Sequence, residues 1–167
     1  MPLIATKFVL MNKKPSLTVH EALLKLMQYC TYQDRCHKEV EKKLDELGMY
    51  HDAKAHIISK LIEDNFLNEE RFAKSFARGK FRIKKWGKIR ITRALKLRQI
   101  SAYNLNTALK EISEDDYLKT LNELVDYKYK QLGQKLTQAN KQKIYQYLAY
   151  RGFENHLIYE AINNLKT

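Results

Sequence analysis

Apolar residues recur along the chain in three copies of one spacing pattern. The leucines Leu44, Leu95 and Leu148 serve as anchors for the three copies. In every copy the positions at −4, +5, +14 and +17 from the anchor are also apolar: Val40, Met49, Ile58 and Leu61; Ile91, Ile100, Leu109 and Ile112; Ile144, Phe153, Ile162 and Leu165. Steps of three and four residues follow one face of an α-helix. The pattern therefore predicts a pair of helices joined by a short turn, repeated three times.

The residue four positions after each anchor marks the turn between the paired helices. It is Gly48, Gln99 or Gly152. A glycine just past a helix end adopts the left-handed conformation at no steric cost. Gln99 must make the same turn at some cost or use another geometry. After the turn, Asp52 and Ser101 are the expected N-caps of the next helices.

A further helix is predicted before each pair, over residues 18–29, 68–84 and 113–132. Asn68 is expected to cap the second of these helices, because Glu69 and Glu70 follow in its first turn. Ser113 followed by Asp116 resembles a capping box with Asp in place of Glu.

The fold class predicted is all-α, with three tandem three-helix repeats in an elongated, curved molecule. The expected divisions are a flexible N-terminal arm over 1–17 and three repeats over 18–66, 67–112 and 113–167. Only five glycines and two prolines are present, which favours helices over a many-stranded sheet. Lys7 interrupts the mildly apolar start and no small-residue cleavage site follows, so we do not expect a signal peptide there.

The positive charge is concentrated in the predicted middle repeat. The formal net charge of the chain is +12. No acidic residue lies between Glu70 and Glu111, whereas 13 Lys and Arg residues do. Arg71, Lys74 and Arg78 follow each other at steps of three and four, on a stripe separate from the apolar one. A helix with one apolar face and one purely cationic face indicates a surface that contacts phosphates.

Nine basic residues of this segment are the candidate contacts for nucleic acid or for an anionic filament. Their predicted role is electrostatic: to steer and hold an anionic groove. They are Arg71, Lys74, Arg78, Arg82, Lys84, Lys85, Lys88, Arg90 and Arg93.

Three segments resemble a known family. Residues 61–73 (LIEDNFLNEERFA) are similar to the signature of the RecX family, an apolar pair and a turn followed by acidic residues and Arg-Phe-Ala. Residues 85–91 (KWGKIRI) resemble the basic segment of that family, and residues 38–44 (KEVEKKL) resemble its entry into the first helix pair. The chain departs from the family at Asn68 or Glu69, where members often have Asp, and at Gln99, where they usually have Gly.

The resemblance implies a non-enzymatic regulator with three tandem three-helix repeats. It implies binding along the helical groove of the RecA recombinase filament, with inhibition of its ATP hydrolysis and strand exchange, and some binding to single- or double-stranded DNA. Recombination and the SOS response would be modulated as a consequence.

The sequence offers few other sites for chemistry. No glycine-rich phosphate loop is present, and Cys30, Cys36 and His37 do not have the paired spacing of zinc ligands. The acidic pair Asp115 and Asp116 is explained by the first turn of a helix. We therefore expect no cofactor, no metal and no catalytic residue. Two cysteines and no apolar run of about 20 residues fit a cytoplasmic, reduced protein without a membrane segment, and we expect a monomer.

Two other functions remain as alternatives. A stand-alone helical nucleic-acid-binding module would place one helix of a repeat in a major groove. A small helical nuclease or RNA-modifying enzyme would require metal-dependent turnover. Trp86 lies among basic residues, where we interpret it as a packing residue rather than a platform for bases, and the many tyrosines of the last repeat include core and surface positions that the sequence does not separate.

Overall fold

A computed structural model describes residues 17–165. The predicted N-terminal arm therefore lies outside the described residues apart from Leu17. The described part contains nine α-helices and no strand. The helices are α1 (Val19–Tyr32), α2 (His37–Glu46), α3 (His51–Glu63), α4 (Glu69–Lys84), α5 (Lys88–Lys96), α6 (Ala102–Leu109), α7 (Glu114–Gln131), α8 (Gln138–Arg151) and α9 (Asn155–Asn163).

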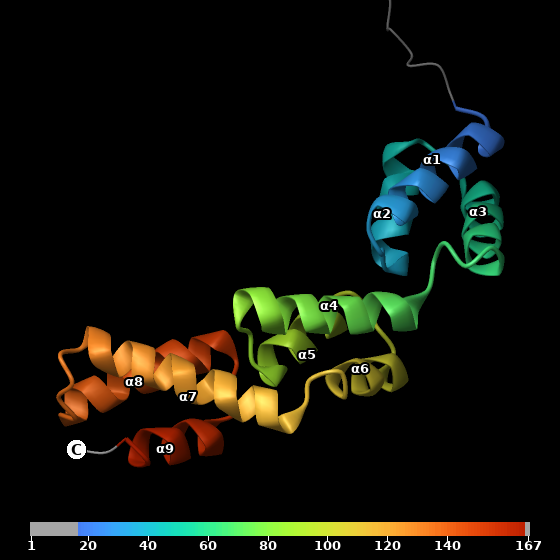
Figure 1. Cartoon of the computed structure of the whole chain (residues 1–167). Helices are drawn as coiled ribbons and strands as arrows, with labels where there is room; N and C mark the ends of the chain where they lie inside the picture. Colours follow the sequence, from blue (N-terminus) through green and yellow to red (C-terminus); the bar gives the residue numbers. More distant parts are fainter. Residues whose placement is uncertain (1–16, 166–167) are drawn as a thin grey trace, which may run out of the picture.

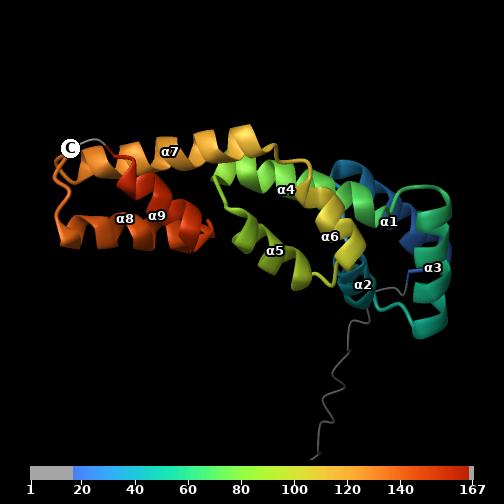
Figure 2. The ribbon, with the colours of Figure 1, turned by 90° about the horizontal axis from the view of Figure 1, so that it is seen from below.

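The helices form three successive groups of three. Helices α1–α3 make the first repeat, α4–α6 the second and α7–α9 the third. Both views place the second repeat between the other two, so the molecule is elongated, and the first repeat turns away from the row formed by the others (Figure 1, Figure 2). The predicted fold class is confirmed.

Side-chain caps define several of the predicted helix starts. The side chains of Asn68, Ser101 and Ser113 accept hydrogen bonds from backbone amides at the starts of α4, α6 and α7. The prediction for Asp52 is wrong: the N-cap of α3 is Tyr50, and Asp52 lies in the first turn, where its charge favours the helix dipole. Thr18 forms a complete capping box at the start of α1.

The three turns within the repeats share one geometry. The turn residues Gly48, Gln99 and Gly152 all have positive φ, at 73°, 61° and 88°. In each copy the next amide donates to the carbonyl of the anchor leucine, at 3.0, 3.2 and 3.2 Å. Gln99 therefore makes the turn of the two glycines, and its Cβ makes this left-handed conformation costly.

The buried positions fall into two hydrophobic cores. The first repeat has its own core, which contains Leu26, Leu44 and Leu61, among others. The second and third repeats share one continuous core, which reaches from Phe72 to Ile162. Of the three apolar positions at +14, Ile162 is buried, whereas Ile58 and Leu109 are partly buried and the buried residues beside them, Ile57 and Ala108, lie one position earlier.

The second and third repeats meet backbone to backbone. A Cβ on Gly87 would overlap the carbonyl of Gly152, and one on Gly152 would overlap Arg90. The amide of Gly87 donates to the carbonyl of Arg151 at 2.8 Å, and that of Ile89 donates to Gly152 at 3.0 Å. The third repeat thus satisfies amides at the start of α5, where the N-cap Gly87 has no side chain to do so.

Tyr117 on α7 completes this junction. Its hydroxyl accepts from the amide of Lys88 at 2.9 Å and donates to Glu154 at 2.6 Å. Its ring packs between those of Phe81 and Phe153, at centroid distances of 5.9 and 5.1 Å. Burial, followed by the hydrogen bond to Glu154, raises the pKa of the Tyr117 hydroxyl.

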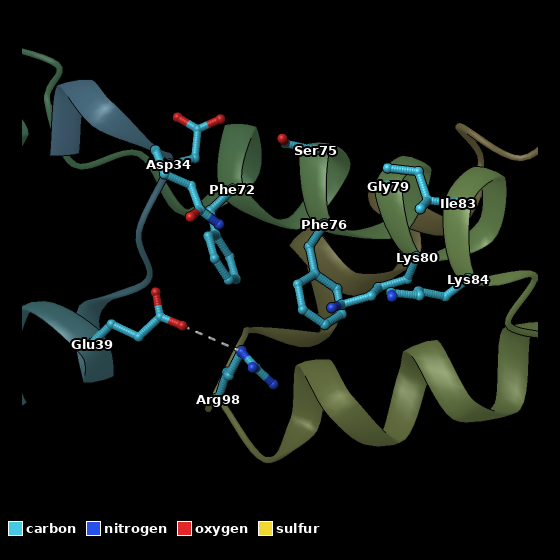
Figure 3. A pocket seen from close by; sticks show the side chains of 11 residues that line it. Asp34, Glu39, Phe72, Ser75, Phe76, Gly79, Lys80, Ile83, Lys84 and Arg98 are labelled. Carbon is cyan, nitrogen blue, oxygen red and sulfur yellow. Dashed lines mark ion pairs between the residues drawn. The ribbon is translucent and has the colours of Figure 1, made fainter. Parts of the chain in front are cut away.

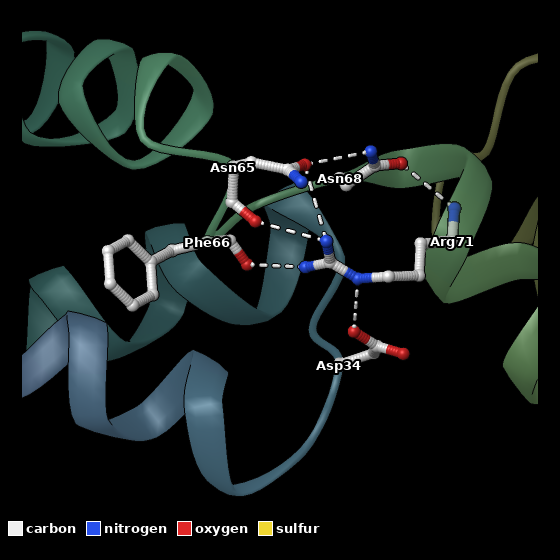
Figure 4. A network of polar contacts seen from close by, with 5 residues as sticks. All are labelled: Asp34, Asn65, Phe66, Asn68 and Arg71. Carbon is white, nitrogen blue, oxygen red and sulfur yellow. Dashed lines mark hydrogen bonds and ion pairs between the residues drawn. The ribbon is translucent and has the colours of Figure 1, made fainter.

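The first and second repeats are joined mainly by long side chains. Arg71 of α4 reaches back to the linker between α3 and α4, where it donates to the carbonyls of Asn65 and Phe66 at 3.0 and 3.1 Å (Figure 4). Its Nε donates to Asp34, which follows α1, at 2.8 Å. Lys38 of α2 donates to the carbonyl of Leu97 at 3.0 Å. Among the described residues before the linker, Cys36 is the one buried residue that belongs to the core of the later repeats.

Candidate polyanion-binding surface

Three of the nine candidate residues lie within the first ten residues of α4 and contact acidic groups. Arg71 holds Asp34, as described above. Lys74 pairs with Glu70 at 2.7 Å, and Arg78 pairs with Glu111 at 2.8 Å. The hydrogen bond to Glu70 raises the pKa of Lys74. The expectation of a helix face without acidic partners is wrong here, because Glu70 lies one turn before Lys74 on the same helix and the fold brings Glu111 to Lys74 and Arg78.

Two candidates of α5 are held by the third repeat. The ammonium of Lys88 pairs with Glu114 at 2.8 Å and lies over the ring of Tyr117. The guanidinium of Arg90 lies between the rings of Trp86 and Tyr150, at 4.2 and 4.8 Å from their centroids. Both cations are therefore held in position by these contacts.

The other four candidates have no carboxylate partner among the described residues. Within residues 17–165, no ion pair joins Arg82, Lys84, Lys85 or Arg93 to an acidic side chain. Arg82, Lys84 and Arg93 are exposed and Lys85 is half-buried. These four residues lie at the end of α4, at its C-cap and on α5, and we call them the free basic group. Their charges are available to an anion in solvent.

A groove of mixed charge separates the first repeat from α4. It is lined by Phe72, Phe76 and Ile83 of α4, with Glu39 of α2 on one side and Arg98 on the other (Figure 3). Arg98 lies 3.6 Å from Glu39 across this groove. Lys80 and Lys84 also line this groove, so the free basic group reaches it through Lys84, but Asp34 and Glu39 line it as well and its charge is mixed.

A second groove runs between α5 and the end of α8 and contains no acidic residue. It has a volume of about 350 Å³. We call it the α5–α8 groove, and its lining residues are Trp86, Ile89, Arg90, Arg93, Ala94, Leu97, Ala149, Tyr150 and Gly152. Two of the nine candidates, Arg90 and Arg93, are therefore brought to one apolar groove.

The sequence pattern missed residues that shape this surface. Tyr150 and Arg151 come from the third repeat, more than 50 positions from α5. Arg151 lies over the ring of Tyr147 at 4.7 Å and donates to the carbonyl of Lys84 at 2.9 Å. The sequence signals were the abundance of tyrosines in the last repeat, which includes Tyr150, and the position of both residues just before the third turn glycine. Trp86 packs against the shared core, as predicted, and also contacts Arg90.

Residues suited to metal chemistry do not gather within the described part of the chain. Between residues 17 and 165, no three His, Cys, Asp or Glu side chains come together in a group able to hold a metal ion. Cys30 and Cys36 are free and buried, and burial raises the pKa of both thiols. None of the nine helices has the length and apolarity to cross a membrane.

These features define a class of protein: a helical repeat protein with an extended basic surface on its middle repeat. Residues 68–109 match the model of the RecX second three-helix domain, and residues 114–162 match that of the RecX third three-helix domain. The chain belongs to the RecX family.

Relatives and solved structures agree with this assignment. The chain is 30% identical over 145 residues to the Regulatory protein RecX of Lactobacillus gasseri, and 23% identical over 148 residues to that of Bacillus mycoides. These alignments cover 87% and 89% of this chain but 53% and 55% of the relatives, so the chain spans about half the length of the curated relatives it matches. A crystal structure of RecX from Lactobacillus salivarius is similar with a TM-score of 0.79 and 25% identity, over 88% of this chain and 96% of that one.

Proposed function

We propose that this chain is a non-enzymatic, cytoplasmic regulator that binds the RecA recombinase filament and its DNA and inhibits RecA ATP hydrolysis and strand exchange. The observation that carries the proposal is the free basic group on the middle repeat of a RecX-family fold. An elongated repeat protein suits a filament groove better than a small-molecule site, because its contact surface is long and continuous.

All nine basic residues remain candidates for this contact. Their acidic neighbours, or the lack of them, rank the residues by the attraction that each is expected to offer an anionic partner. Within the part of the chain that the structure describes, Arg82, Lys84, Lys85 and Arg93 have no carboxylate partner to give up, so an anionic partner gains their full attraction. Lys74, Arg78 and Lys88 would share theirs with the glutamates that they already contact. We therefore expect the free basic group to contribute most of the electrostatic attraction.

The test is a titration of the chain into RecA hydrolysing ATP on single-stranded DNA. The proposal predicts inhibition by the wild-type chain. The variant with Arg82→Glu, Lys84→Glu, Lys85→Glu and Arg93→Glu should lose most of it, at least about tenfold in the inhibiting concentration. Its thermal unfolding should stay close to that of the wild type, because these side chains make no ion pair within the described residues.

A matched control separates this surface from net charge. Lys25, Lys42, Lys119 and Lys143 are exposed, belong to the first and third repeats and have no ion pair within residues 17–165. Changing these four lysines to Glu alters the net charge by the same amount. Retained inhibition in this control supports a specific surface, whereas equal loss in both variants contradicts it.

The second candidate function is a stand-alone nucleic-acid-binding module, which the same cationic surface favours. A DNA-only titration distinguishes the two. Neutralisation of about 6–10 phosphates would lower DNA affinity by roughly 10³–10⁵-fold between about 50 and 200 mM salt. Tight binding to DNA together with unchanged RecA activity would replace the first proposal by this one.

A further inference from the structure

The α5–α8 groove combines an apolar floor with a cationic rim. Aliphatic groups come from Ile89 and Ala94 of α5, from its C-cap residue Leu97 and from Ala149 of α8. Ile89 and Leu97 are large apolar side chains that are 43% and 67% exposed. Exposed large apolar side chains that line one groove indicate a surface that another molecule covers.

The groove is preformed, because contacts within the chain hold its walls in place. Arg90 is held between Trp86 and Tyr150 and donates to the carbonyl of Tyr150 at 3.2 Å. The contact between Gly87 and Gly152 fixes α5 against the end of α8. A preformed groove costs little ordering entropy on binding, so even a short segment can bind to it.

The charges around the groove select an anionic partner. Neither α5 nor α8 contains an acidic residue. Arg90 and Arg93 line the groove, and Arg93 is exposed and has no ion pair within residues 17–165. An acidic partner would therefore meet two arginines and no carboxylate on the lining of the groove.

We propose that the α5–α8 groove binds an acidic peptide segment of a partner protein, with one large apolar side chain of the peptide on the aliphatic floor. This proposal rests on the proposed function, which identifies the partner as RecA. It adds the kind of segment by which that partner would contact the groove. The floor favours a peptide over nucleic acid, because Ile89, Ala94 and Leu97 present branched or small aliphatic groups. Bases stack on flat aromatic faces, and the two aromatic rings of the lining, Trp86 and Tyr150, already hold the Arg90 guanidinium between them.

The test measures fluorescence anisotropy of a labelled peptide with a Leu–Phe pair between two runs of glutamate, titrated with the full chain. Arg93→Glu, and separately the double variant Ile89→Ser with Leu97→Ser, should each weaken binding by about tenfold or more. Replacement of the Leu–Phe pair by Ala–Ala in the peptide should weaken it by a similar factor. Circular dichroism melts verify that each variant is folded.

Two controls make the result specific. Lys96→Glu changes the same charge in the last turn of the same helix, outside the lining, and Tyr103→Ser removes an exposed apolar side chain on α6. Each should weaken binding by less than about threefold. Equal effects of Lys96→Glu and Arg93→Glu, or equal binding of the two peptides, would overturn the proposal in favour of general charge attraction. Binding of oligo(dT) that the groove variants abolish would overturn it in favour of a nucleic-acid site.

RecA binding by the same variants separates this inference from the proposed function. Loss of filament binding in both groove variants supports the two together. Filament binding that neither variant affects contradicts the groove as the docking site and leaves the proposed function intact. A chain that binds the Leu–Phe peptide but not RecA supports the groove and contradicts the proposed function.

Discussion

The two junctions between repeats are built in different ways. The second and third repeats are joined by backbone hydrogen bonds, two glycines in contact and one continuous core. The first and second repeats are joined mainly by side chains, above all Arg71, and their cores are largely separate. A junction held by backbone hydrogen bonds allows little rearrangement, whereas a junction held by long side chains can open locally. We therefore infer that α4–α9 unfold as one unit and that the first repeat is attached to it less firmly.

The largest expected effect is at Gly87, where any side chain forces the second and third repeats apart. Gly87→Ala should lower the free energy of unfolding by about 3 kcal/mol, because the added Cβ meets backbone that cannot move aside. Thermal denaturation should then show Tm reduced by roughly 6–12 °C. Gly79→Ala is the matched control: nothing lies within 4 Å of its added Cβ in α4. It should raise stability by about 0.5–1 kcal/mol. Equal behaviour of the two variants would contradict the rigid junction.

A smaller and more local effect is expected at Arg71. Arg71→Ala removes the hydrogen bonds to Asn65 and Phe66 and the ion pair with Asp34, at a cost of about 1–3 kcal/mol. Hydrogen exchange should rise over the α3–α4 linker and the α1–α2 loop and stay unchanged in α7–α9. Arg82→Ala, which removes an exposed guanidinium without an ion pair in the described chain, should leave exchange as it was. Faster exchange throughout α4–α9 in Arg71→Ala would show that the two junctions are coupled.

The smallest effect is a pH dependence at Tyr117, within the tighter junction. Because its pKa is raised in the folded chain, the unfolded chain loses the phenol proton first as the pH rises. The stabilisation is complete below pH of about 10 and is lost above it, by about 1 kcal/mol between about pH 10 and pH 11. Chemical denaturation at both pH values should show a shallower loss for Tyr117→Phe. The control Tyr103→Phe, on exposed α6 surface, should keep the full slope.

Much of the local structure follows from the sequence pattern. Apolar periodicity located the helix pairs, and Asn68, Ser101 and Ser113 marked helix starts because their side chains act on amides within the next turn. The turn at Gln99 was less predictable. Its Cβ disfavours the left-handed conformation. Burial of the anchor Leu95 before the turn and of Ile100 after it imposes that conformation.

The candidate surface was predictable in charge and not in arrangement. The excess of Lys and Arg between Glu70 and Glu111 is visible in the sequence. Which of those cations are free depends on where Glu111 and Glu114 come to lie after folding, and no periodicity gives that position. The groove that contains Arg93 depends on Tyr150, which belongs to another repeat.

The sequence by itself determined the helices, their grouping into three repeats and the cationic character of the middle one, because these properties arise from residues within a few turns of one another. Tertiary structure alone decided which cations keep a free charge, how Gly87 meets Gly152, and that two repeats share a core while the first remains apart. Those outcomes depend on contacts between residues tens of positions apart, whose pairing is set by the packing of whole repeats and not by local spacing.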